Sequence, residues 1–320
     1  MLTSAVGITF LIIGIVLLLI ILFGIIPPFI IANKVFNSQL VRNDKTKWLR
    51  ECSAPDNVEQ MAMYNAGLEW AKGFKDKIEE VEITSFDGLH LVGEYFNFNS
   101  DKCVIILQGR TESLWYTYYY AKPYSDMGYN ILVVDSRAHG LSEGKYNTVG
   151  LKEYKDILKW ADLIHDKYGI SKFILHGICI GSATALYAIT EDKKDYFKAI
   201  IADGMYTSFY ETFRTHMIAE KRPVHPFIDF VRLIMKIKTG VDMKSYGPEK
   251  AIKKLNKPIL FLYSKEDKFS LPAKSEYLYD ITPGDKKIVW FDHGAHSHIR
   301  INNLEKYDQE VKDFCNAKFE

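Results

Sequence analysis

The sequence predicts an α/β fold, in which a mostly parallel β-sheet is flanked by helices, preceded by one transmembrane helix. Short apolar runs rich in Ile, Val and Phe alternate with amphipathic segments along most of the chain. This alternation is typical of repeated β-α units, whose strands are buried on both faces of the sheet. A longer apolar stretch stands alone near the N-terminus. The 320 residues, 48% of them hydrophobic, suffice for one large domain with a substantial core.

The N-terminal apolar stretch reads AVGITFLIIGIVLLLIILFGII from Ala5 to Ile26, and Thr9 is its only polar residue. At a helical rise of ~1.5 Å per residue it spans roughly 30 Å, the thickness of the hydrocarbon core of a bilayer. A cleaved secretory signal usually starts with basic residues and ends at a small-x-small site. Only MLTS precedes this stretch, and PPFIIANK follows it. We therefore expect an uncleaved membrane anchor within residues 1–32.

Basic residues and cysteines bear on the side of the membrane where the rest of the chain lies. No Lys or Arg precedes the anchor, and a cluster follows it closely: Lys34, Arg42, Lys45, Lys47 and Arg50. The positive-inside rule then places the domain on the cytoplasmic side of the cell membrane, although a large domain can be translocated regardless, so the extracellular face stays open. The four cysteines form no CxxC pair, which agrees with a reducing compartment. They are Cys52, Cys103, Cys179 and Cys315.

Residues 33–77 are expected to connect the anchor to a folded domain over residues 78–320. The first part of this segment is polar and charged and reads as a juxtamembrane connector. The second part, DNVEQMAMYNAGLEWAKGF, predicts a helix with Asp56 as its N-cap and Glu59 three residues later, the spacing of a capping box. We expect this helix to pack against the edge of the domain.

The domain begins with a predicted β-hairpin around an Asp-Gly turn. Six further apolar runs predict buried strands: CVIIL, NILVVD, KFILHG, KAIIADG, PILFLYS and KIVWF. The clearest helix between them covers residues 151–167, where the apolar side chains share one face. The segment at about 205–257 is too long for a simple crossover and predicts an inserted helical lid over the site. The alternative is that its apolar face rests on the bilayer surface.

A tight turn between a strand and a helix is predicted at Gly177–Gly181, which reads GICIG. KFILH ahead of it is typical of a strand, and SATALYA behind it of a helix with small residues for close packing. Such a strained turn needs small residues two before and two after the exposed residue, because the backbone passes close to itself. We predict that Cys179 is a nucleophile. The alternative is a buried cysteine that packs as a small hydrophobe.

Two loops after later strands carry the acid and the base that such a nucleophile needs. Asp267 follows the strand PILFLYS, and the alternatives are its neighbour Glu266 and Asp203, which ends an earlier strand. The loop after the next strand reads HGAHSH and offers three histidines: His293, His296 and His298. The order nucleophile, acid, base, with each group at the carboxyl end of a strand, suits an open α/β sheet. No Cys or carboxylate lies at zinc-like spacing beside these histidines, so a metal site is not expected.

The segment GYNILVVDSRAHGLSEG, residues 128–144, resembles the α/β-hydrolases, in particular bacterial serine aminopeptidase-like hydrolases with an N-terminal membrane helix. The resemblance covers roughly residues 78–314. This chain departs from the family pattern at three positions: Cys179 replaces the nucleophilic serine, Gln108 replaces a histidine, and Ala138 replaces a glycine. Dienelactone hydrolases use cysteine as the nucleophile on this fold, so the first departure does not by itself imply inactivity.

The resemblance also implies roles for individual residues. The family's base directly follows a Gly-Ala pair, which selects His296. The segment LQGRTE at 107–112 supplies one oxyanion-hole amide, Arg110 N–H, with Thr111 as second choice, and the residue after the nucleophile, Ile180, supplies the other. Asp135 and His139 are expected to tie their loop together by hydrogen bonds rather than to take part in chemistry.

We therefore predict a membrane-anchored hydrolase that cleaves an ester, thioester or lactone bond of a small acyl substrate through Cys179, His296 and Asp267, with no cofactor. The net charge of +1 gives no indication of a basic surface that would bind nucleic acid. Peptidase activity is disfavoured, because a thiolate leaves the tetrahedral adduct more easily than a poor amine does. The remaining alternatives are a non-catalytic binding module with a hydrolase fold and a scaffold at the membrane.

Overall fold

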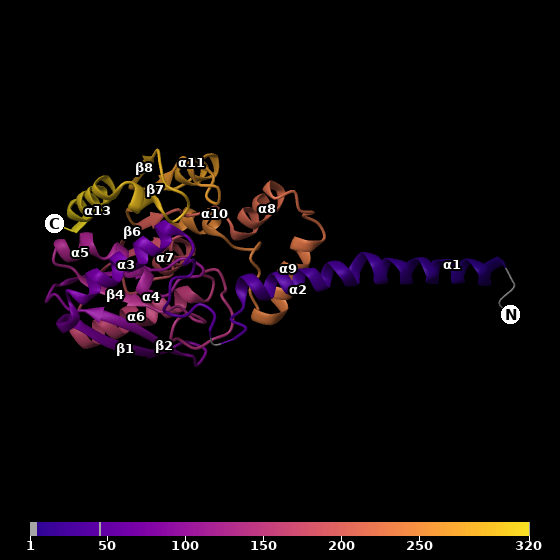
Figure 1. Cartoon of the computed structure of the whole chain (residues 1–320), viewed down its shortest axis with the longest axis horizontal. Helices are drawn as coiled ribbons and strands as arrows, with labels where there is room; N and C mark the ends of the chain where they lie inside the picture. Colours follow the sequence, from indigo (N-terminus) through magenta and orange to yellow (C-terminus); the bar gives the residue numbers. More distant parts are fainter. Residues whose placement is uncertain (1–4, 45, 320) are drawn as a thin grey trace.

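An eight-stranded β-sheet forms the centre of the computed structural model, which describes residues 5–44 and 46–319 (Figure 1). The strands lie in the order β1-β2-β4-β3-β5-β6-β7-β8, and all neighbours from β4 onward pair in parallel. They are β1 (Ile78–Thr84), β2 (His90–Phe96), β3 (Lys102–Leu107), β4 (Asn130–Val134), β5 (Lys172–Ile178), β6 (Phe197–Asp203), β7 (Ile259–Ser264) and β8 (Lys286–Phe291). The predicted mostly parallel sheet with an antiparallel start is confirmed.

Strands β1 and β2 form the predicted hairpin, and β2 continues the antiparallel pairing onto β4. Gly88 in the turn has a φ of +88°, a left-handed conformation that glycine adopts without a Cβ clash. The Ser85 hydroxyl oxygen accepts a hydrogen bond from the Leu89 N–H at 2.8 Å, which closes the turn. The hairpin therefore forms one edge of the sheet and leaves the opposite, parallel part for the site.

Helices cover both faces of the sheet (Figure 1). Alternate residues of β3 show this directly, because Cys103 and Ile105 belong to one cluster of buried apolar side chains and Val104 and Ile106 to another. Successive strand residues point to opposite faces, so both faces are dry. The covering helices are α3 (Val58–Lys72), α4 (Leu114–Thr117), α5 (Lys122–Asp126), α6 (Glu153–Tyr168), α7 (Ile180–Thr190), α11 (Pro272–Asp280), α12 (Ile299–Asn302) and α13 (Leu304–Phe319).

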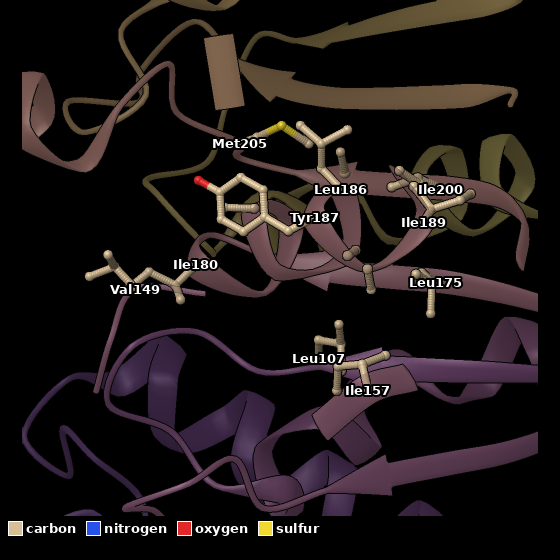
Figure 2. Close-up of a cluster of buried hydrophobic side chains, with 14 of the residues drawn as sticks. Leu107, Val149, Ile157, Leu175, Ile180, Leu186, Tyr187, Ile189, Ile200 and Met205 are labelled. Atoms are coloured by element: carbon tan, nitrogen blue, oxygen red, sulfur yellow. The ribbon is translucent and has the colours of Figure 1, made fainter. Parts of the chain in front are cut away.

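Helix α7, which directly follows Cys179, is the most deeply packed of these helices. Every residue from Ile180 to Ile189 is buried. Figure 2 shows Leu186 and Ile189 in one cluster with Leu175 of β5 and Ile200 of β6. Close packing of this kind holds the start of the helix, and with it Cys179, in a fixed position against the sheet.

The expected N-cap of α3 is wrong by one residue. The helix begins at Val58, and the side chain of Asn57, not that of Asp56, accepts a hydrogen bond from the backbone N–H of Gln60 at 3.0 Å. A capping side chain satisfies the N–H two or three residues after it, so a cap at Asn57 matches the observed helix start.

The N-terminal apolar segment forms one long helical rod that projects away from the domain (Figure 1). It comprises α1 (Ala5–Leu19), the π-helical turn η1 (Ile20–Ile25) and α2 (Ile26–Leu40). The part from 6 to 40 is long and apolar enough to cross a membrane, and its most apolar window is not buried by the rest of the chain. The helix continues past residue 32, where we expected the anchor to end, and its last turns enter the domain: Ala32, Phe36 and Leu40 are buried in the core.

The segment after α2 is fastened to the domain. The Arg42 guanidinium donates to the carbonyl oxygens of Ser142 and Gly140 at 3.1 and 2.9 Å. Arg50 forms ion pairs with Glu94 and Asp135, both at 2.8 Å. Because these partners belong to the sheet and its loops, the C-terminal end of the anchor helix is tied to the domain.

The insertion between β6 and β7 is helical, as predicted. It contains α8 (Phe209–Ala219), α9 (Phe227–Thr239), α10 (Pro248–Ala251) and the short 3₁₀ turn η4 (Ile252–Lys254). Helix α9 lies along α2 on the side of the domain from which the anchor projects (Figure 1). The rings of Phe29 and Phe230 meet edge to face with centroids 5.7 Å apart.

Candidate active site

Cys179 occupies a strained turn between β5 and α7. Its φ of +56° and ψ of −112° are rare for a residue with a side chain. The turn also requires both flanking glycines, since a Cβ on Gly177 would lie 2.3 Å from backbone atoms of Gly181 and Ser182, and one on Gly181 would lie 2.2 Å from the Leu107 carbonyl oxygen. The GICIG sequence is therefore explained by sterics, and the side chain of Cys179 projects from the turn while the backbone packs tightly.

The backbone around Cys179 leaves one amide free to bind an anion. The Cys179 N–H donates to the Asp203 carbonyl oxygen at 2.8 Å. Ile180 is the first residue of α7, so its N–H has no acceptor within the helix. The positive end of the helix dipole also points at this position, which favours a negative oxygen beside Cys179.

Asp267 and His296 are brought together, as the sequence predicts. The Asp267 Oδ2 atom lies 2.8 Å from His296 Nδ1, and the Asp267 side chain is fully buried. Its other oxygen, Oδ1, accepts hydrogen bonds from the N–H groups of Phe269 and Ser270 at 2.7 and 2.8 Å. The carboxylate is thus held from both sides and fixes the orientation of the imidazole.

The second ring nitrogen of His296, Nε2, is buried and has no hydrogen-bond partner of nitrogen or oxygen among the described residues. Burial by itself lowers the pKa of His296. Interaction with the Cys179 sulfur and with the Asp267 carboxylate outweighs this effect and raises the pKa of His296 well above its usual range. The imidazole therefore lies between the cysteine and the carboxylate, in the arrangement that a charged imidazolium prefers.

Asp203 and Glu266, the alternative acids, have other partners. Asp203 is fully buried and accepts a hydrogen bond from the Tyr307 hydroxyl at 2.8 Å. Glu266 is exposed and accepts from the Gly294 N–H at 3.0 Å. Of the three acids only Asp267 contacts His296 through a hydrogen bond.

His293 and His298, the alternative bases, also point elsewhere. His293 is exposed and pairs with Glu266 at 3.5 Å. The Nε2 atom of His298 lies 2.7 Å from Gln60 Oε1, and its Nδ1 atom 3.1 Å from Glu59. Within residues 5–44 and 46–319 no group of three His, Cys, Asp or Glu side chains has the geometry to hold a metal ion.

The loop after β3, where the first oxyanion amide is expected, is anchored by neighbouring side chains. The Arg110 carbonyl oxygen lies 2.8 Å from His139 Nε2 and 3.3 Å from Asn147 Nδ2. No hydrogen bond from the Arg110 N–H to another described residue is present. Asp135 accepts hydrogen bonds from the N–H groups of Leu114 and Leu141. Asp135 and His139 therefore tie loops together, as expected.

Gln108 stands where the resembling hydrolases have histidine. In the orientation of the Gln108 side-chain amide that gives both of its polar atoms a hydrogen-bond partner, the nitrogen donates to the Val134 carbonyl oxygen and the oxygen accepts from the Ser136 N–H, both at 2.9 Å. The glutamine thus joins the loop after β3 to the loop after β4, and the backbone that carries the Arg110 N–H keeps its support.

Comparison with known proteins agrees with this architecture. Residues 102–225 match the family described as alpha/beta hydrolase fold. The uncharacterized protein YqkD of Bacillus subtilis is 30% identical over 216 residues, which cover 66% of this chain and 70% of that protein. The chain belongs to the α/β-hydrolase family. An uncharacterized membrane protein of Saccharomyces cerevisiae is 24% identical over 267 residues, 78% of this chain and 87% of that protein.

The fold of this α/β-hydrolase also matches solved structures. An esterase from Pyrococcus furiosus superposes with a TM-score of 0.64 at 24% sequence identity, covering 78% of this chain and 94% of the esterase.

A cavity of about 470 Å³ joins the cysteine and histidine of the hydrolase to its lid and to its N-terminal helix. Ligand pockets that enclose drug-sized molecules usually measure roughly 300–1,000 Å³. Its lining residues come from α2, the loop after β3, the turn at Cys179, the lid and the loops after β7 and β8. They include Val35, Phe36, Gln39, Leu40, Arg110, Glu112, Cys179, Ile180, Phe209, Phe213, Val231, Phe269 and His296.

Glu112 is a lining residue to which the sequence assigned no role. Burial raises the pKa of its carboxyl, and the positive charges of Arg110 and His296 oppose that rise. Its Oε2 atom folds over Gly109, where a Cβ would approach it to 2.2 Å. The only signal in the sequence is its place in the segment LQGRTE, which could not indicate that the side chain turns back toward the cavity.

Asp203 makes a testable contribution to the pH dependence of stability. Burial raises the pKa of this carboxyl to about 7, although the Tyr307 hydroxyl and the charge of His296 oppose the rise. A carboxyl whose folded-state pKa exceeds its unfolded value stabilises the fold most at low pH, and this contribution is lost as the pH rises from about 4 through about 7. The protonated acid is thus the form that the folded protein prefers.

We expect Asp203→Asn to remove this dependence, because the neutral amide can still accept the Tyr307 hydrogen bond. The pH dependence of stability is measured as the thermal unfolding midpoint of each detergent-solubilised protein at pH 5 and at pH 8. The wild-type midpoint should fall more between the two pH values than the variant midpoint, by several degrees for each ~1 kcal/mol that is lost. Equal falls in both proteins would contradict a buried, titrating Asp203.

Proposed function

We propose that this α/β-hydrolase is a membrane-anchored enzyme that hydrolyses acyl esters, thioesters or lactones through a covalent intermediate on Cys179. The observation that carries the proposal is the geometry at the cavity: a cysteine on a strained turn at a helix N-terminus shares one cavity with His296, and Asp267 orients that histidine at 2.8 Å. A nucleophile, a base and a group that orients the base are the parts that acyl transfer needs.

In the proposed reaction the Cys179 thiolate attacks the carbonyl carbon of the substrate, and a C–S bond forms. The N–H groups of Ile180 and Arg110 stabilise the negative oxygen, each by roughly 3–4 kcal/mol in comparable enzymes. The bond from the carbonyl carbon to the leaving oxygen or sulfur then breaks, and the His296 imidazolium protonates the leaving group. Water, deprotonated by His296, releases the acid and restores the thiol.

The anchor and the fastened connector support the proposed location. The helical rod would place the domain beside the bilayer, and the basic residues after the rod favour the cytoplasmic face of the cell membrane. The proposed reaction uses only side chains and backbone amides of this chain, and a small acyl compound is its proposed substrate.

Selective alkylation tests the proposed nucleophile. Purified full-length protein in detergent is treated with iodoacetamide at pH 7, and the modification of each cysteine is followed by mass spectrometry. Cys179 should react at least about tenfold faster than Cys52, because it shares the cavity with His296, a base that can take up the thiol proton. Cys103 and Cys315 are buried, and burial raises the pKa of both thiols, so they should stay unmodified.

His296→Ala is the matched variant in the alkylation experiment. It should slow the modification of Cys179 and leave that of Cys52 unchanged, because Cys52 does not line the cavity. Modification of Cys179 at the rate of Cys52 in the wild type would argue for a binding module that has kept the fold without the chemistry.

A further inference from the structure

One wall of the cavity is formed by the N-terminal helix itself. Val35, Phe36, Ser38, Gln39 and Leu40 of α2 line the same cavity as Cys179 and His296. The Arg110 guanidinium donates to the Gln39 carbonyl oxygen at 2.9 Å, which joins the end of α2 to the loop of the expected oxyanion amide. A membrane anchor that served only as a tether would have no reason to form part of the substrate cavity.

The distance from the bilayer to this wall is short. The rod exposes large apolar side chains from Val6 to Ile31, which at ~1.5 Å per residue exceeds the roughly 30 Å of a hydrocarbon core. Its last exposed apolar residues therefore lie at the level of the lipid headgroups. Val35 is one helical turn further along, roughly 6 Å. The part of α2 that lines the cavity thus starts about one helical turn beyond the level of the lipid headgroups.

The cavity lining combines apolar and charged side chains. Apolar side chains from α2 and from the lid face the cavity, among them Val35, Phe209, Phe213 and Val231. The charged lining residues of the lid, Glu220 and Arg222, are exposed and pair with each other at 2.8 Å. An apolar part beside charged side chains, which include the buried Arg110 and Glu112 as well as this exposed pair, suits a molecule that combines an acyl chain with a polar head.

The lid and the anchor helix form one packed unit. Helix α9 lies along α2, Phe230 packs on Phe29, and Lys238 hydrogen-bonds Asn33 at 3.3 Å. The lid is therefore held at the membrane-proximal end of the domain (Figure 1). A chain that leaves the bilayer along α2 would enter the cavity that α2 and the lid both line, and would reach Cys179 there.

We propose that the substrate is a long-chain acyl ester or thioester that resides in the bilayer and enters along α2, with its acyl chain against Val35 and Leu40. This inference rests on the proposed function of Cys179. The reaction on such a substrate forms a fatty acyl thioester on Cys179 and releases the head group with a proton from His296. Water then releases the fatty acid and regenerates the thiol.

The test compares two substrates on the full-length protein reconstituted in phosphatidylcholine–phosphatidylglycerol vesicles. The first is methylumbelliferyl palmitate dissolved in the vesicle membrane, and the second is the water-soluble ester p-nitrophenyl butyrate. Val35→Trp and Ser38→Trp each place a large side chain on α2 that narrows the cavity. Ser38 is exposed, so its replacement removes no contact in the core. Ile30→Trp, on the same helix but outside the cavity, is the control.

We expect the ratio of palmitate to butyrate hydrolysis to fall at least about tenfold in Val35→Trp and Ser38→Trp and to stay unchanged in Ile30→Trp. Cleavage of butyrate without cleavage of the vesicle-borne palmitate, or an unchanged ratio in both cavity variants, would overturn the bilayer substrate while leaving the proposed function intact. Faster cleavage of palmitoyl-coenzyme A added as a soluble monomer would also overturn it, since that substrate arrives from water. Failure to cleave any of these esters, with no acyl adduct on Cys179, would instead overturn the proposed function.

Discussion

Replacing Cys179 with alanine should lower kcat/KM for p-nitrophenyl butyrate by a factor on the order of 10⁶, the loss in kcat seen when a covalent nucleophile is removed from a comparable enzyme. The physical reason is that no hydroxyl group among the described residues hydrogen-bonds to His296 Nε2, so His296 activates no oxygen nucleophile that could replace Cys179. Hydrolysis rates of the full-length protein in detergent, with the uncatalysed rate subtracted, measure the effect. The residual rate would report oxyanion stabilisation alone.

Cys52→Ala is the matched control for this experiment. Cys52 is half-buried like Cys179 but lies in the segment between the anchor and α3, outside the cavity. Its removal should change the rate by less than about twofold, and neither variant should lower the thermal midpoint by more than a few degrees, because neither thiol belongs to a buried cluster core. An active Cys179→Ala variant would contradict the proposed nucleophile, whatever the fold.

The turn at Cys179 could be predicted from the sequence because its cause is local. Gly177 and Gly181 are required by contacts within a few residues and with the neighbouring strand β3, and such sterics leave the same spacing in every sequence that adopts the turn. The strands could be predicted for a similar reason, since burial on both faces demands continuous apolar runs.

The sequence favours Asp267 but could not exclude Asp203 from the residues alone. Both aspartates end or follow a parallel strand, so both reach the same edge of the sheet. What separates them is a hydrogen bond of 2.8 Å from His296 to one and from Tyr307 to the other, and this depends on where α13 places Tyr307. Sequence spacing carries no record of a contact between residues 104 positions apart.

The role of α2 as a cavity wall is hidden in the sequence for a different reason. Residues 33–53 contain many polar and charged side chains, which made them read as a connector. The signal was the spacing of Ala32, Phe36 and Leu40, four residues apart, which places them on one helical face. Three positions are too few for their periodicity to predict a buried helical face. The surface of the lid that packs against this face comes from a segment almost 200 residues later in the sequence.

Asp267→Asn should lower kcat on the order of 10⁴-fold, as the loss of the orienting carboxylate does in comparable triads. The amide would offer its oxygen or its nitrogen to His296 without the charge that raises the pKa of the imidazole. The alkaline limb of the rate profile should therefore move to lower pH, a change that a purely structural defect would not produce. Rates from pH 5 to pH 10 on the soluble butyrate ester measure both effects.

Asp203→Asn is the matched variant that separates the two candidate acids. Both side chains are buried, both substitutions replace a carboxylate by an amide of the same shape, and both sites lie at the carboxyl ends of neighbouring strands. Because Asp203 bonds to Tyr307 and interacts with His296 only through its charge, its replacement should change kcat by less than about threefold and move the alkaline limb less than Asp267→Asn does. A large loss in Asp203→Asn together with a mild one in Asp267→Asn would assign the orienting role to Asp203, and the imidazole would then have to turn away from the carboxylate that it contacts in this structure.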